Sequence, residues 1–274
     1  MWDVHVYIFY SLVVYLIWKF VLCELPDYVI YYAKFGFYIV SSQIVSAVLL
    51  PYLAIRPRDL RNGNLMARIM QHVSKVLGVK WEHRNEKILL EETGAIVVAN
   101  HQSALDILGM FSVCHVAPKT APVCKKEILY LFPFGLAAYL NGCIFIDRRN
   151  PEAARNILKA EADILFKNMS KIWMYPEGTR NKTCDKLQPF KKGAFNLAIA
   201  CQAPIIPVVT SPYYFLDGEK RIFNNGRAII QCLEPVPTKG LTMDDLPELL
   251  DRVHKMMEVT YLELGNEVAC LAAN

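Results

Sequence analysis

The first fifty residues contain two long apolar runs, one from Val4 to Leu22 and one from Tyr28 to Leu50. Each run carries a single lysine near one of its ends, where the side chain can reach the membrane interface. Each is long enough to cross roughly 30 Å of hydrocarbon as a helix. Because only residues 23–27 connect them, the pattern predicts a membrane-embedded helical hairpin, with residues 1–54 as the anchor.

A cleaved signal peptide is the alternative for the first run, but no Lys or Arg precedes it and no small-residue cleavage site follows it. A re-entrant or interfacial first segment also stays open. Four arginines within residues 56–68 follow the second run, whereas the connector between the runs is acidic. The positive-inside rule therefore places everything after Pro51 on the cytosolic side.

After residue 55, short apolar runs alternate with amphipathic stretches. The runs are mostly β-branched or aromatic, which predicts buried strands at residues 95–99, 143–146, 172–175, 205–210 and 228–233. Helical periodicity predicts helices from Asp106 toward His115, from Asn150-Pro151, from Gly193 to Cys201, and from Pro247 past Tyr261. This alternation predicts that residues 55–274 form an α/β domain, with a central, mostly parallel sheet and flanking helices.

Polar clusters follow four of the predicted strands, at the point where each strand ends. They are Asn100-His101, Asp147-Arg148-Arg149, Pro176 to Arg180, and Ser211. In an open α/β sheet, ligands bind outside the carboxyl ends of the strands. We therefore expect these four segments to converge on one site.

His101 and Asp106 are the candidate catalytic pair. Histidine titrates near neutral pH, so it can accept a proton from a hydroxyl group and return it later. Within one helix, a spacing of five residues separates two side chains by about 140°, so the pair can meet only if His101 lies on the turn before a helix. Ser103 is a candidate N-cap at that turn. The alternative is that Ser103 to Asp106 is an ordinary capping box without a catalytic part.

The segment from Glu177 to Arg180 is a candidate for binding phosphate. Gly178 lets the backbone approach a ligand closely, and Thr179 and the Arg180 guanidinium can both donate hydrogen bonds to phosphate oxygens. The alternative is a polar turn that ends a strand. Arg148 also has two interpretations: it is either a second phosphate ligand or a solvated charge on a loop.

Basic residues elsewhere change the picture little. The pairs at 125–126 and 191–192 fit a solvated face, although Lys192-Gly193 before a helix can offer an anion-binding N-terminus. The chain has 30 basic and 26 acidic residues, a formal net charge of +4. That excess is too small to indicate nucleic-acid binding, and it suits a protein beside an anionic membrane surface.

The eight cysteines form no C-x-x-C pair, and no Cys/His cluster has zinc spacing. We expect reduced thiols and no metal site. The chain also lacks a G-x-S-x-G elbow, a P-loop and a G-x-G-x-x-G motif, which argues against a serine hydrolase, an NTP enzyme or a dinucleotide enzyme.

Four motifs in order carry a resemblance to a known family: Asn100-His101-x₄-Asp106, Gly142 to Arg148, Tyr175 to Arg180, and Ile206-Pro207-Val208. With them the chain resembles the glycerophospholipid acyltransferases. It looks most similar to the 1-acylglycerol-3-phosphate acyltransferases, also called lysophosphatidic acid acyltransferases. The similarity covers roughly residues 55 to 260, and the four motifs together are far more specific than any one of them.

The resemblance implies a role for each matching residue. His101 would be the general base on the sn-2 hydroxyl of lysophosphatidic acid, with Asp106 orienting it. The substrate phosphate would be held by Arg148, Glu177, Gly178, Thr179 and Arg180. The family's Lys-x-Glu-Leu element matches residues 125–128 with Ile in place of Leu, which makes Lys125 a secondary phosphate ligand. The acyl or CoA path would be lined by Ile206, Pro207 and Lys192.

The reaction implied by the resemblance is acyl-CoA plus lysophosphatidic acid giving phosphatidic acid plus CoA. Acyl-CoA would be a co-substrate, with no further cofactor, and the location would be the endoplasmic reticulum membrane, with the domain facing the cytosol. Other readings are acylation of another lysophospholipid or of glycerol 3-phosphate, a membrane-bound lipid or CoA-binding module without turnover, and a thioesterase-like hydrolase.

Overall fold

The computed structural model describes residues 11, 25–117, 119–181, 183 and 185–272. Within them, a central sheet has seven strands in the order β1-β9-β6-β2-β5-β3-β4. The strands are β1 (Val79–Arg84), β2 (Ala95–Ala99), β3 (Thr120–Lys125), β4 (Ile144–Ile146), β5 (Lys171–Met174), β6 (Ile205–Thr210) and β9 (Gly226–Cys232). Every neighbouring pair is parallel except β6 with β9. The predicted α/β fold with a mostly parallel sheet is therefore confirmed.

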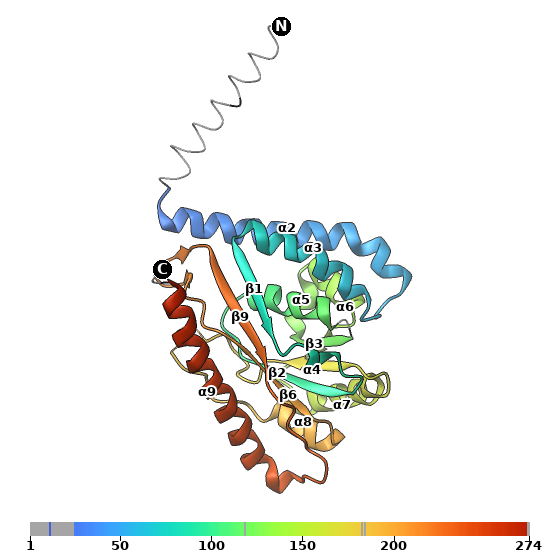
Figure 1. Cartoon of the computed structure of the whole chain (residues 1–274). Coiled ribbons are helices and arrows are strands. Elements are labelled where there is room, and N and C mark those ends of the chain that lie inside the picture. The colour runs from blue at the N-terminus through green and yellow to red at the C-terminus, as the bar shows by residue number, and fades with distance from the viewer. Residues whose placement is uncertain (1–10, 12–24, 118, 182, 184, 273–274) are drawn as a thin grey trace.

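Helices cover both faces of this sheet (Figure 1). One side carries α2 (Asp27–Ile55), α3 (Asn62–Val76), α5 (Asp106–Val116) and α6 (Phe134–Leu140), and the other carries α7 (Pro151–Lys167), α8 (Gly193–Cys201) and α9 (Leu246–Ala272). Shorter elements are α4 (Lys87–Leu90), η2 (Lys126–Tyr130), η3 (Met243–Asp245) and a hairpin of β7 (Leu216–Asp217) and β8 (Ile222–Phe223).

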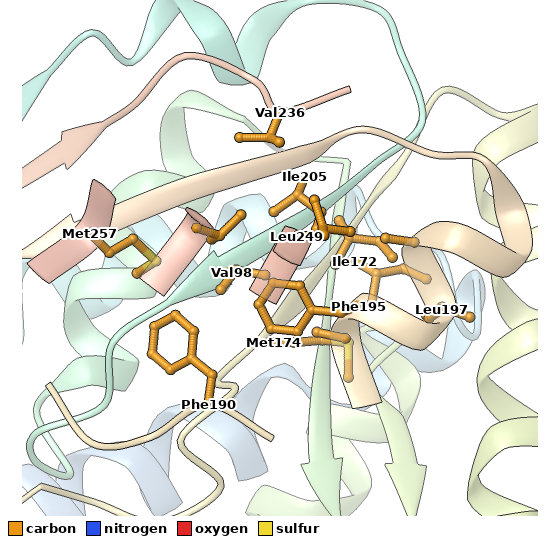
Figure 2. Close-up of a cluster of buried hydrophobic side chains, with 14 of the residues drawn as sticks. Val98, Ile172, Met174, Phe190, Phe195, Leu197, Ile205, Val236, Leu249 and Met257 are labelled. Carbon is orange, nitrogen blue, oxygen red and sulfur yellow. The ribbon is translucent and has the colours of Figure 1, made fainter. Parts of the chain in front are cut away.

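Strand β2 lies at the centre of the core and is buried on both faces. Ile96 and Val98 belong to the core beneath α8 and α9, whereas Val97 packs on the side of α3 and α5. Figure 2 shows the first of these cores, where Phe195 of α8 and Met257 of α9 meet the sheet. A strand buried on both faces reads as a continuous apolar run, which is why its sequence predicted its bounds without error.

Helix α2 lies across the α/β domain along its length (Figure 1) and packs on α3, α6 and β8. Tyr38, Leu49 and Leu53 are buried at this contact, and the Tyr38 hydroxyl donates to the Ala104 carbonyl oxygen at 3.2 Å. In the described part of the chain, α2 is the helix long and apolar enough to cross a membrane by length and composition. The first helix of the predicted hairpin lies outside the described residues.

The opposite face of α2 is apolar and exposed. Its members share an exposed fraction above two fifths and lie within about 120° of one another around the helix axis. They are Phe37, Val40, Ile44, Val48, Tyr52 and Ile55. We call this set the outer face of α2. The helix therefore presents one apolar face to the protein and a second one away from it, and α2 ends at Ile55.

Candidate active site

The site forms at the carboxyl ends of the parallel strands, where the polar clusters were expected to meet. Asn100 and His101 follow β2, and the Asn100 side chain is buried against β6. Its Nδ2 donates to the Thr210 carbonyl oxygen at 3.0 Å, and its Oδ1 accepts from the Thr210 N–H at 2.7 Å. These two hydrogen bonds between the Asn100 side chain and the Thr210 backbone tie β2 and β6 together just before His101.

His101 and Asp106 are in direct contact. Asp106 is the first residue of α5, His101 lies on the turn before it, and His101 Nδ1 is 2.5 Å from Asp106 Oδ2. The same oxygen accepts the backbone N–H groups of Gln102 at 2.6 Å and Ser103 at 3.0 Å. The other oxygen accepts the Tyr213 hydroxyl at 2.8 Å.

This geometry sets the tautomer of the imidazole. An ionised carboxylate can only accept hydrogen bonds, so the ring nitrogen that faces Asp106, Nδ1, carries the proton. The lone pair of Nε2 is then left to accept a proton. Asp106 is 5% exposed, whereas the His101 side chain is 23% exposed and so remains reachable by a ligand. Ser103 is not the N-cap of α5, because Leu105 holds that position and makes no side-chain cap hydrogen bond. The Asp106 carboxylate contacts the histidine and also accepts the N–H groups of the turn before the helix.

Tyr175 fixes the plane of the histidine ring. The two rings are stacked, with their centroids 4.3 Å apart and their planes 23° apart. The Tyr175 hydroxyl lies 3.4 Å from the Asp106 carbonyl oxygen. A ring held between this face and the Asp106 carboxylate has little freedom to rotate away from a substrate.

The segment after β5 binds the backbone of His101 on both sides. Glu177 Oε1 accepts the His101 N–H at 2.6 Å, and the Asn181 N–H donates to the His101 carbonyl oxygen at 2.7 Å. Glu177 Oε2 accepts the Gln188 N–H at 3.2 Å. Burial raises the pKa of Glu177 to about 7, although the N–H donors of His101 and Gln188 act in the opposite direction. The contacts of Glu177 thus suit holding His101 in place, and its predicted part in phosphate binding stays a prediction.

Cationic side chains lie around the same loop. Arg148 Nη1 donates to the Gly178 carbonyl oxygen at 2.6 Å, which joins the loops after β4 and β5. Gly178 has φ of +73°, and a Cβ there would lie 2.8 Å from Lys191 Nζ. Thr179 and Arg180 are exposed beside it. The positive φ favours glycine at this position, whereas the flexible end of the Lys191 side chain could move aside.

The remaining predicted residues lie at different depths. Lys125 ends β3 and Lys192 is the N-cap of α8, and both are exposed. Ile206 and Pro207 are buried inside β6, where they are paired with residues of β2. The structure does not bring these two side chains to an accessible surface, so their part in an acyl or CoA path stays a prediction. The described residues contain no group of three or more His, Cys, Asp or Glu side chains that could hold a metal ion.

Four supporting residues were missed by the sequence reasoning: Gln102, Tyr175, Tyr213 and Tyr261. The Gln102 side chain donates to the carbonyl oxygens of Thr210 and Ser211, and Tyr261 of α9 donates to Gln102 Oε1 at 3.2 Å. Gln102 and Tyr175 are adjacent to recognised motifs, so their place in the chain was a usable signal. Nothing local marks Tyr213 or Tyr261.

Comparison with known proteins agrees with this site. A family model described as acyltransferase matches residues 80–211, which include the His101 loop, the Arg148 loop and the segment after β5. The chain thus has an acyltransferase domain. It is 36% identical over 238 residues to human 1-acyl-sn-glycerol-3-phosphate acyltransferase alpha, covering 86% of this chain and 83% of that protein. The human beta protein is 37% identical over 238 residues, covering 86% and 84%.

With relatives this similar over most of both chains, the protein belongs to the 1-acyl-sn-glycerol-3-phosphate acyltransferase family. Its fold is also similar to the crystal structure of PlsC, the 1-acyl-sn-glycerophosphate acyltransferase of Thermotoga maritima. That likeness has a TM-score of 0.68 at 20% sequence identity and covers 87% of this chain and 95% of the other.

Proposed function

We propose that this enzyme transfers a fatty acyl group from acyl-CoA to the sn-2 hydroxyl of lysophosphatidic acid, giving phosphatidic acid and CoA. The observation that carries the proposal is the His101–Asp106 contact at 2.5 Å, with His101 partly exposed. The names of the human relatives supply the acceptor.

The chemistry needs one base and no covalent enzyme intermediate. His101 Nε2 accepts the proton of the sn-2 hydroxyl while that oxygen attacks the thioester carbonyl carbon. Asp106 stabilises the imidazolium that forms. When the C–S bond breaks, His101 returns the proton to the sulfur of CoA. A positioned base of this kind contributes roughly 10²- to 10⁴-fold to the rate.

Both substrates carry phosphate, and the rim of the site carries the matching charge. Arg148 lies on the loop after β4, Arg180 lies with Gly178 on the loop after β5, and both arginines are exposed. A guanidinium can bind phosphate through two hydrogen bonds. These two residues, with Thr179, are the proposed ligands of the acceptor phosphate.

The acceptor is an amphiphile, and helix α2 supports a location at a membrane. Its outer face is apolar, while its other face is occupied by the domain. We infer that α2 lies flat in the interface of the bilayer, with its outer face in lipid, as monotopic helices do. The endoplasmic reticulum and the cytosolic side are parts of the same proposal.

One assay tests the function. Wild-type protein and His101→Ala would be given acyl-CoA with lysophosphatidic acid, lysophosphatidylcholine, glycerol 3-phosphate or no acceptor. His72→Ala is the matched control, because His72 is an exposed histidine on α3. We expect transfer to lysophosphatidic acid that is lost in His101→Ala by 10²-fold or more and unchanged in His72→Ala.

Other outcomes distinguish the rival functions. Preference for another acceptor would replace lysophosphatidic acid as the substrate. Fatty acid release without an acceptor would indicate a hydrolase, and binding without turnover would indicate a lipid or CoA-binding module. Full transfer by His101→Ala would remove His101 as the base.

A further inference from the structure

Three large apolar side chains project from the end of η2 and the turn that leads to α6. Tyr130 is 70% exposed, Leu131 is 51% exposed and Phe132 is 72% exposed. We call residues 130–132 the apolar tip. Single exposed apolar residues are common on soluble proteins, but a contiguous set of this size marks an interaction surface.

The apolar tip is held firmly in its exposed position. Gly135 packs its backbone so tightly on η2 that an added Cβ would lie 2.3 Å from the carbonyl oxygens of both Ile128 and Leu129. The Gly135 N–H donates to the Leu131 carbonyl oxygen at 2.7 Å. The backbone on either side of the tip is therefore fixed, and the three side chains are kept away from the core.

The tip lies next to helix α2. The Phe134 N–H, two residues beyond the tip, donates to Gln43 Oε1 of α2 at 3.3 Å. At about 100° per residue, Gln43 lies on the border between the buried face of α2 and its outer face. Val40 and Ile44, its neighbours on the outer face, are 56% and 57% exposed. The tip thus leaves the domain where the apolar outer face of α2 begins.

Basic residues border the tip on the side of the active site. Lys125 precedes η2, Lys126 is its first residue and both are exposed, and the Arg149 side chain of the loop after β4 is 83% exposed. Glu127 is the one acid in η2, and it lies 4.0 Å from Arg149. An apolar surface with a basic border matches the acyl region and the anionic headgroups of a phospholipid bilayer.

We propose that the apolar tip inserts into the bilayer beside α2 and forms a second membrane contact at the rim of the active site. The inference deepens the proposed function and rests on it, because the tip continues directly from Lys125, a candidate ligand for the acceptor phosphate. With the tip in lipid, Lys125 lies at the level of the headgroups, and a lysophospholipid reaches His101 from the bilayer along this edge.

The test compares a triple variant, Tyr130→Ser with Leu131→Ser and Phe132→Ser, with a control pair, Val259→Ser with Leu262→Ser. The control residues are 50% and 49% exposed on α9, away from α2. Each protein would be assayed with long-chain lysophosphatidic acid in phosphatidylcholine–phosphatidylserine vesicles, and with a short-chain form free in solution. We expect the triple variant to lose about tenfold in vesicle binding and in turnover on vesicles, but to keep turnover of the soluble acceptor.

A triple variant that matches the control pair in vesicle binding would overturn the inference, as would one that loses turnover of the soluble acceptor equally. If wild type binds vesicles through the tip but acylates neither form of lysophosphatidic acid, the proposed function fails and the membrane contact stands.

A second measurement, of tryptophan fluorescence, keeps the apolar surface of the tip. Phe132→Trp adds an indole at the tip, and Leu262→Trp adds one at the control position. On vesicles containing brominated phosphatidylcholine, we expect quenching of the added fluorescence in Phe132→Trp and not in Leu262→Trp. No quenching of the added fluorescence in Phe132→Trp would show that the tip lies outside the lipid, as it would if it bound a protein instead.

Discussion

The Asp106 carboxylate performs two tasks at once. It orients His101, and it also accepts the backbone N–H groups of Gln102 and Ser103 on the turn before α5. An acid at a helix N-terminus is favourable for the same reason that a carboxylate near an imidazolium is. Replacing Asp106 would therefore disturb both the base and the turn that presents it, so its loss cannot be interpreted as a catalytic effect alone.

Tyr213 separates the two effects, because its hydroxyl donates to the carboxylate oxygen of Asp106 that does not face His101. We expect Tyr213→Phe to lower kcat by about tenfold, since a hydrogen bond to a charged group contributes roughly 1.5–3 kcal/mol. The KM for the acceptor should change little, because Tyr213 lies behind Asp106. The measurement is steady-state kinetics, with Tyr214→Phe as the control, whose hydroxyl accepts the Arg227 N–H instead. A fall in both variants would count against the positioning role.

Glu177 makes a prediction about pH. Burial raises its pKa from 4.5 to about 7 in the folded protein. A carboxyl group with a raised pKa contributes stability that is fully present below its unfolded pKa and is lost as the pH rises through the folded value. Between about pH 5.5 and about pH 8, wild type should lose about 2 kcal/mol of unfolding free energy relative to Glu177→Gln.

The check on Glu177 is urea unfolding of both proteins across that pH range. Glu177→Gln will be less stable in absolute terms at low pH, because an amide cannot accept from both backbone N–H groups. The prediction concerns only how the difference in unfolding free energy between the two proteins changes with pH. Parallel curves would show that Glu177 titrates at an ordinary carboxyl pKa in the fold.

At the scale of single residues, the sequence predicted the site where the reasoning was local. The requirement that His101 precede the helix that begins near Asp106 followed from helix geometry and is confirmed. Tyr213 and Tyr261 escaped because they lie 107 and 159 residues from the groups they contact. A contact of that range depends on the packing of the sheet and of α9, which no local pattern encodes.

At the scale of elements, the start of α7 was predicted from two residues. Asn150 accepts the Ala153 N–H at 3.1 Å, and Pro151 occupies the first turn. Asn150→Ala should cost about 1 kcal/mol of unfolding free energy, while Asn150→Asp should be nearly neutral. Denaturant unfolding of the three proteins checks this, and equal stability of Asn150→Ala and wild type would show that solvent replaces the cap.

The elements that were missed lack the apolar runs on which the prediction depended. Strand β1 carries Lys80, Glu82 and Arg84 because it is an edge strand, so its pattern is polar. Strand β3 contains Pro122, which cannot donate to a ladder and argues against a strand. The structure accommodates it because pairing of β3 with β5 ends at Pro122 and pairing with β4 begins at Val123.

At the scale of the whole molecule, the two faces of α2 should have separable effects. Leu53 is fully buried against the domain, whereas Val48 is 70% exposed on the outer face. Leu53→Ala should lower the unfolding free energy by about 3 kcal/mol, and Val48→Ser should leave it almost unchanged. In vesicle binding the order should reverse, with the larger loss in Val48→Ser. Equal effects on stability would contradict the docking of α2.

The loop that carries His101 is supported by residues encoded much later in the chain. Asn100 bonds to Thr210, and Gln102 accepts from Tyr261, which leaves the ribosome 159 residues after it. The apolar residues of α2 are translated long before either support. A nascent chain can therefore reach a membrane while its histidine is still unsupported, and it gains activity toward lipid only after α9 has folded onto the sheet.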